Sequence, residues 1–152
     1  KLEGGVEIAG NVRRIVDMGI PVMGHLGLTP QSINKFGGYG LRAKSEAEAA
    51  KLLADARALE EAGCFSIVLE KIPAALARKV TELAHVPTIG IGAGVATDGQ
   101  VLVTTDMMGM TQGFKPKFLR QFAQVGEEMT KGVAAFCQAV KGCGYPNESE
   151  SY

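Results

Sequence analysis

The stretch CFSIVLE, residues 64–70, is the strongest strand signal in the chain. Its apolar run ends in a carboxylate, as expected of a buried strand whose last residue reaches the edge of a sheet. Segments with helical periodicity flank it at residues 45–63 and 73–84. Because short apolar strands alternate with amphipathic helices, the sequence predicts an α/β protein with a parallel sheet.

The same pattern extends in both directions from this strand. Further short apolar runs predict strands at residues 20–26, 87–91 and 100–104. Helical spacing predicts a helix at 6–18 and another at 115–141, the latter in two pieces around Gly126. We find no internal repeat and no linker, so we expect one domain.

Three further segments carry local signals. Ser45 and Glu48 form an S-x-x-E pattern, in which each side chain is expected to bond the other residue's backbone N–H. Residues 27–44 are Gly-rich and lack periodicity, and a loop of that length is usually functional or disordered. The polar tail at 146–152 is expected to be frayed.

Composition excludes several classes of protein. The 152 residues carry 16 Lys and Arg against 16 Asp and Glu, and 46% are apolar. A formal net charge of zero offers no electrostatic footprint for nucleic acid or for an anionic membrane. No apolar run reaches the roughly 18 residues that a membrane span needs. Three cysteines without a redox or zinc spacing are expected to be reduced thiols, as in a cytoplasmic protein.

Candidate functional residues follow from the predicted sheet, because ligands of parallel α/β proteins bind beyond the carboxyl ends of the strands. The residues expected there are Glu3, His25, Glu70, the loop 90–94 and Asp106. Polar groups at such positions are costly to bury without a purpose.

Glu70 is the most informative of these candidates. A carboxylate that is partly removed from water holds a proton more readily, which suits a general base or acid near neutral pH. It can equally be a solvated strand-end residue, or one paired with Lys71. His25 is either part of a site or a hydrogen-bonded structural residue, and His85, on the opposite side of the sheet, is expected to be structural. Glu3 is a candidate base or metal ligand, although one carboxylate does not make a Mg²⁺ site.

The glycines at 90–94 allow two interpretations. A phosphate or dinucleotide cradle is one, but the spacing here is G-x-G-x-G and a turn follows where the dinucleotide-binding motif has a helix. Close approach of the backbone to a neighbour explains the glycines better. The apolar segment 107–110 is expected to pack and not to bind a cofactor.

Several segments, taken in order, resemble the ketopantoate hydroxymethyltransferase family. They are KLEGG (1–5), GIPVMGHLGLTPQS (19–32), GGYGLRAK (37–44), FSIVLEKIP (65–73), PTIGIGAG (87–94) and DGQVLVTTDMMG (98–109). The resemblance implies a (β/α)8 TIM barrel of the phosphoenolpyruvate/pyruvate type and a cytoplasmic, decameric, Mg²⁺-dependent enzyme. Its reaction transfers a hydroxymethyl group from 5,10-methylenetetrahydrofolate to 3-methyl-2-oxobutanoate, giving 2-dehydropantoate in pantothenate biosynthesis.

The resemblance also implies roles for four residues. Lys1 matches the lysine that contacts the keto acid, Glu3 matches a carboxylate of the metal shell, and His25 matches a histidine of the substrate pocket. Glu70 matches the proposed general base. A cover formed by residues 27–44 would exclude water from the reaction. An unchanged rate of proteolysis of this loop on adding substrate would argue against that role.

This chain departs from the family in two ways. A complete barrel needs about 250 residues, so we expect residues 1–152 to be the C-terminal portion, about strands four to eight. The absent strands carry two Asp metal ligands and a Ser that binds the keto acid. Second, Lys71 follows Glu70 where the family commonly has a small residue, and its charge either stabilises the carboxylate or points into solvent.

Two rival hypotheses remain open. A Mg²⁺-dependent lyase of the same superfold would also use strand-end carboxylates on a 2-oxo acid but would not need folate. A non-catalytic barrel fragment would expose a sheet edge and associate or aggregate. A soluble monomer with Mg²⁺-dependent activity would contradict the expectation that the chain is incomplete and inactive alone.

Overall fold

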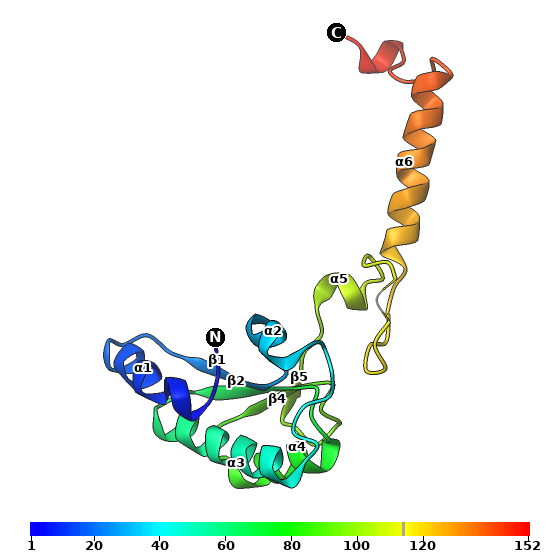
Figure 1. Cartoon of the computed structure of the whole chain (residues 1–152). Helices are drawn as coiled ribbons and strands as arrows, with labels where there is room; N and C mark the ends of the chain where they lie inside the picture. Colours follow the sequence, from blue (N-terminus) through cyan, green and yellow to red (C-terminus); the bar gives the residue numbers. More distant parts are fainter. Residues whose placement is uncertain (114) are drawn as a thin grey trace. The chain divides into compact units, whose positions relative to one another are not determined.

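A computed structural model describes residues 1–113 and 115–152. The chain forms two compact units, Lys1–Val101 and Leu102–Tyr152, which are described separately. The first unit contains a parallel sheet of five strands in the order β1-β2-β3-β4-β5 (Figure 1). The α/β class and the parallel sheet are therefore confirmed. A sequential order is also that of a barrel wall, but closure into a barrel stays a prediction.

The strands are short and lie close to the predicted positions. Their bounds are Leu2–Glu3 (β1), Met23–Gly27 (β2), Ser66–Glu70 (β3), Thr88–Ile91 (β4) and Gly99–Gln100 (β5). The strand predicted at 100–104 is wrong in extent, because only Gly99 and Gln100 pair with β4. After Val103 the chain turns into a short helix, α5, Thr104–Met107. Asp106 thus lies in a helix and does not end a strand.

Three longer helices of the first unit lie along one face of the sheet (Figure 1). They are α1 (Val6–Asp17), α3 (Glu46–Glu61) and α4 (Ala74–Leu83). The predicted long loop carries two short helical turns, η1 (Pro30–Ser32) and α2 (Ile33–Phe36). At the start of α3, Ser45 Oγ accepts from Glu48 N at 3.3 Å, as predicted. The reciprocal bond is not made, since Glu48 Oε2 accepts from Lys44 N at 3.1 Å instead.

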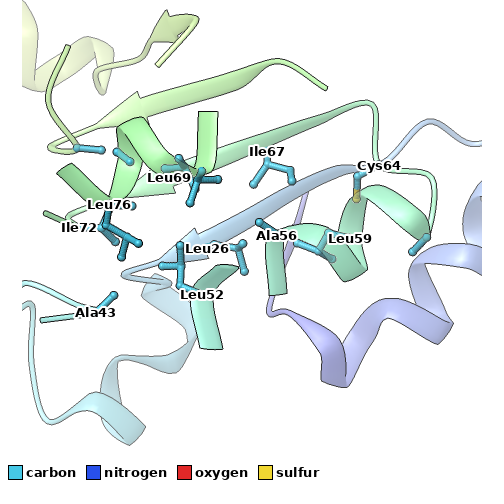
Figure 2. Close-up of a cluster of buried hydrophobic side chains, with 14 of the residues drawn as sticks. Leu26, Ala43, Leu52, Ala56, Leu59, Cys64, Ile67, Leu69, Ile72 and Leu76 are labelled. Atoms are coloured by element: carbon cyan, nitrogen blue, oxygen red, sulfur yellow. The ribbon is translucent and has the colours of Figure 1, made fainter. Parts of the chain in front are cut away.

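The hydrophobic core lies between the sheet and these helices. Figure 2 shows side chains from β2 and β3, such as Leu26, Ile67 and Leu69, in one cluster with Leu52 and Leu59 of α3. Burying each such side chain contributes about 1.5–3 kcal/mol. The side chains of the strands alternate between faces, so Glu3, His25 and Glu70 lie on the face away from this core.

The second unit contains α5, the longer helix α6 (Val125–Lys141) and a short turn, η2 (Glu148–Glu150). The prediction of a helix from residue 115 is wrong. Pro116 begins a turn in which Leu119 N donates to Pro116 O, and α6 starts at Val125 as one continuous helix. Gly126 lies in the first turn of α6, where a glycine does not break a helix. The tail expected to fray contains η2, capped by Asn147.

Two further expectations concern cysteines and membrane spans. All three cysteines lie among the described residues and are free, with Cys64 buried and Cys137 and Cys143 exposed. Burial raises the pKa of the Cys64 thiol. None of the helices in the described part of the chain has the length and apolar character to cross a membrane.

Candidate active site

Three of the predicted strand-end residues come together on one face of the sheet. In the register of the strands Glu3 lies opposite His25, and Gly27 lies opposite Glu70. His25 Nε2 is 3.1 Å from Glu70 Oε2, and His25 Nδ1 is 3.6 Å from Glu3 Oε1. The imidazole therefore lies between two carboxylates, one from each neighbouring strand.

His25 is buried, whereas both carboxylates reach the surface. Its side chain is 1% exposed, compared with 11% for Glu3 and 17% for Glu70. In the tautomer that carries the proton on Nε2, His25 donates to Glu70 Oε2. Among the described residues, His25 Nδ1 is the sole buried side-chain nitrogen or oxygen without a hydrogen-bond partner. A buried polar atom left in this way is costly and is common at functional sites.

The loop that follows β2 holds Glu3 in place. Gln31 N, in the first turn of η1, donates to Glu3 Oε2 at 2.9 Å. This bond leaves Oε1 directed toward His25. Gln31 was not among the residues predicted for the site, although the Thr-Pro-Gln-Ser segment is a helix-start signal that leaves free backbone N–H groups.

The backbone of Glu70 is fixed from both sides. Leu28 N donates to Glu70 O at 2.8 Å, and Lys71 N donates to Ile91 O at 2.9 Å. Gly27 has φ +90°, and a Cβ atom there would lie 2.2 Å from the Glu70 carbonyl oxygen. A glycine is therefore required for β2 to approach the end of β3 this closely.

Lys71 does not pair with the Glu70 carboxylate in the described part of the chain. Its Nζ donates to the carbonyl oxygen of Tyr39 in the long loop. The sequence left open whether Lys71 stabilises the Glu70 carboxylate or points into solvent, and neither alternative describes this contact. The ammonium group of Lys71 binds the backbone of the loop instead.

The remaining predicted candidates are Lys1, the loop 90–94 and Asp106. Lys1 is exposed and lies directly before β1, outside the strand. The glycines at 90–94 permit close packing: a Cβ at Gly90 would lie 2.6 Å from Thr97 Oγ1, and one at Gly94 2.5 Å from Ala74 Cβ. Close backbone approach therefore accounts for both glycines. Asp106 belongs to the second unit.

His85 lies at the other end of the sheet, between α4 and β4. Its Nδ1 is 3.1 Å from Glu60 Oε1, and its side chain is 90% exposed. The Glu60 carboxylate also accepts from His85 N at 2.8 Å. This arrangement fits the structural role expected for His85.

A cavity of about 260 Å³ lies beside His25, between the long loop and α3. Most of the charged residues that line it are paired: Arg42 contacts Glu48 at 2.7 Å, and Lys51 contacts both Glu7 and Asp55 at 2.9 Å. The hydrogen bond to Asp55 raises the pKa of Lys51, and the hydrogen bond from Lys51 lowers the pKa of Glu7. A larger cavity, about 740 Å³, lies between α3 and α4 and is lined by none of the three site residues.

The described part of the chain offers a carboxylate of the type that binds a magnesium ion, but too few such ligands for a complete site. Carboxylate oxygens are the ligands that Mg²⁺ prefers, and Glu3 supplies them at the edge of the sheet. Within residues 1–113 and 115–152, no group of three or more His, Cys, Asp or Glu side chains is arranged to hold a metal ion. Glu3 can thus be one ligand of a site and not the whole of it.

Comparison with known proteins gives the family. The model of the ketopantoate hydroxymethyltransferase family matches residues 1–148. The chain belongs to this family. Proteins named 3-methyl-2-oxobutanoate hydroxymethyltransferase from Parabacteroides distasonis and Bacteroides fragilis are each 59% identical to it over 152 residues. That from Porphyromonas gingivalis is 56% identical.

Each of these alignments covers all of this chain and 56% of the relative. The chain therefore spans little more than half the length of the family members it matches. The relatives are named as enzymes, so the strand-end cluster belongs to an enzyme family.

Proposed function

We propose that the protein transfers a hydroxymethyl group from 5,10-methylenetetrahydrofolate to 3-methyl-2-oxobutanoate and so makes 2-dehydropantoate for pantothenate biosynthesis. The observation that carries the proposal is the alignment of Glu3, His25 and Glu70 on one face, at the carboxyl edge of the sheet. Active sites of parallel α/β folds lie at this edge. The names of the relatives support the same reaction.

In this proposal Glu70 is the general base. It takes the proton from the substrate carbon next to the ketone, and the electron pair of that C–H bond becomes the enolate. The enolate carbon then bonds to the methylene carbon of the folate, and the bonds from that carbon to N5 and N10 both break. Water supplies the hydroxyl oxygen, and the two nitrogens of the released tetrahydrofolate take up the proton removed from the substrate and one proton of the water. His25 orients the carboxylate through the 3.1 Å contact and lines the substrate pocket. Lys1 binds the keto acid.

Glu3 is proposed as one ligand of Mg²⁺, completed by residues beyond these 152. When bound there, the ion would stabilise negative charge on the keto oxygen. The bond from Gln31 N fixes one oxygen of Glu3 and so sets the direction of the carboxylate. The preference of Mg²⁺ for carboxylate oxygens supports this assignment, whereas the number of ligands in this chain does not.

The remaining parts of the proposal concern the whole protein. The sequential strand order supports a (β/α)8 barrel of the phosphoenolpyruvate/pyruvate type, of which this chain forms about strands four to eight. We propose a cytoplasmic homo-oligomer, with the decamer that the family resemblance implies. Gel filtration of the complete protein tests this state, and a monomer would contradict it.

The function is tested in a completed enzyme, in which the part of the Parabacteroides distasonis relative that this chain does not cover is joined to these 152 residues. We expect 2-dehydropantoate to form only when 5,10-methylenetetrahydrofolate and 3-methyl-2-oxobutanoate are both present. The intact relative is the positive control, and circular dichroism checks that the chimera is folded. A folded chimera that cleaves a 2-oxo acid without folate would replace this proposal with a lyase.

A further inference from the structure

The residue after Glu70 has an unusual backbone. Lys71 has φ +46°, and Ala43 in the long loop has φ +54°. Side chains other than glycine rarely adopt this left-handed conformation, and it persists only where the surroundings hold it. The two residues flank one hydrogen bond, in which Arg42 N donates to Lys71 O at 2.9 Å. Backbone strain is therefore present on both sides of the contact between the loop and the end of β3.

Lys71 contacts the loop twice. Its carbonyl accepts from Arg42 N, and its Nζ donates to Tyr39 O. Its own N–H continues the ladder to Ile91 O of β4. The same residue thus joins the sheet that positions Glu70 to the loop segment 37–44, here named the glycine loop.

The glycine loop has few other contacts at its N-terminal half. A Cβ at Gly37, Gly38 or Gly40 would meet nothing within 4 Å. Tyr39 is 64% exposed and Leu41 is 42% exposed. The C-terminal half is held separately, since Arg42 pairs with Glu48 and lies 4.2 Å from the centre of the Phe36 ring. Among the described residues, the bond from Lys71 Nζ is therefore the one hydrogen bond that reaches Tyr39.

We propose that Lys71 is a positioning residue that fastens the glycine loop to the end of β3, next to Glu70, and so orders the loop whose residues Arg42 and Ala43 line the cavity beside His25, the proposed keto acid pocket. The claim about the pocket rests on the proposed function, whereas the claim about the loop does not. Removing the ammonium group leaves the backbone bonds of Glu70 and its contact with His25 in place. The expected loss is therefore in substrate binding and not in proton removal.

Hydrogen exchange of the 152-residue chain tests whether Lys71 holds the glycine loop in place. In Lys71→Met, the amides of residues 37–41 should exchange about fivefold faster, the factor that one hydrogen bond contributes. Exchange in β3 should not change. Lys71→Arg, which keeps a donor, should restore protection, and Lys79→Met on the exposed face of α4 should change nothing. Unchanged exchange in Lys71→Met, or an equal rise in β3, would overturn the proposal.

A glycine at position 71 distinguishes the effect of backbone strain from the effect of the Lys71 side chain on the glycine loop. Lys71→Gly removes the ammonium but accepts a left-handed φ without strain. We expect it to unfold at a higher temperature than Lys71→Met while showing the same fast exchange in residues 37–41. A protected loop in Lys71→Gly would mean that the side chain does not hold it.

Kinetics of the completed enzyme test the consequence for the pocket. Lys71→Met should raise KM for the keto acid about fivefold, again the value of one hydrogen bond, and leave kcat within twofold. If the loop loosens but KM does not change, Lys71 is not a positioning residue. If the completed enzyme is inactive with every variant, the proposed function fails while the exchange result still decides the fastening.

Discussion

The two histidines of the chain lie at opposite ends of the same sheet, and each is 3.1 Å from a glutamate. At the carboxyl edge, His25 is 1% exposed, contacts Glu70 and faces Glu3. At the amino edge, the side chain of His85 is 90% exposed and contacts Glu60. Distance between the paired atoms is therefore no guide to which pair belongs to a site.

The difference lies in desolvation and in the number of charged groups. An exposed ion pair contributes little, because water screens it and its side chains are mobile. A buried imidazole between two carboxylates has no such freedom and leaves one ring nitrogen without a partner. Such an arrangement is costly for stability and is expected where chemistry requires it.

The largest effect on stability is expected from the backbone of the carboxyl edge. Gly27→Ala would bring a Cβ to 2.2 Å from Glu70 O and 2.7 Å from Ile72 Cγ2, at φ +90°. We expect the free energy of unfolding to fall by about 3 kcal/mol, from clash and backbone strain together. Urea unfolding at pH 7 measures it.

Gly99→Ala at the amino edge is the matched control. Its Cβ would lie 3.8 Å from Ile89 Cγ1, an ordinary contact, so the cost should stay within about 0.5 kcal/mol. Equal costs for the two variants would show that the carboxyl edge is not more tightly constrained than the amino edge.

The second prediction compares the histidines themselves. His25→Ala should lower the free energy of unfolding by about 2–4 kcal/mol, because it leaves a cavity and removes the group between two carboxylates. His85→Ala should change it by less than about 0.5 kcal/mol, since that pair is exposed. Thermal and urea unfolding of both variants check the difference, and a larger loss for His85→Ala would reverse the comparison.

The smallest effect is expected from an acid at the amino edge. Asp98 accepts from Thr88 N at 2.8 Å and from Thr88 Oγ1 at 3.0 Å, and these bonds lower the pKa of Asp98 below 3.8. A lowered pKa in the folded state stabilises the protein above pH 3.8, and this contribution is lost as the pH falls through the folded value.

Asp98→Asn should therefore lower the unfolding midpoint slightly at pH 7, and the gap to the parent should shrink below about pH 4. Asp17→Asn, at the exposed end of α1, serves as the control and should leave the midpoint nearly unchanged at both pH values. A gap between parent and Asp98→Asn that widens in acid would contradict the assigned hydrogen bonds.

The carboxyl edge could be predicted from the sequence because side-chain periodicity and strand ends are local properties. The run before Glu70 predicts β3, and the rule that ligands bind at strand ends places Glu3, His25 and Glu70 at one edge, where the structure has them. The glycine pattern likewise indicated the close approach at Gly90.

The contacts made by loops could not be predicted in this way. The bonds from Gln31 to Glu3 and from Lys71 to Tyr39 join residues 28 and 32 positions apart. They depend on how the long loop folds over the sheet, and no periodicity encodes that path. The run at 100–104 has strand propensity, but only two residues find partners in β4, so pairing and not propensity sets the length of β5.

Proton exchange at the substrate carbon next to the ketone shows whether Glu70 is the general base. The completed enzyme is incubated with 3-methyl-2-oxobutanoate in deuterated water, and NMR follows the loss of that C–H signal. We expect Glu70→Gln to slow exchange about 10²–10⁴-fold. Glu60→Gln, its counterpart at the amino edge, should keep the parent rate within about twofold because Glu60 touches no part of the site. Exchange at the parent rate in a folded Glu70→Gln variant would contradict the assignment of Glu70 as the base.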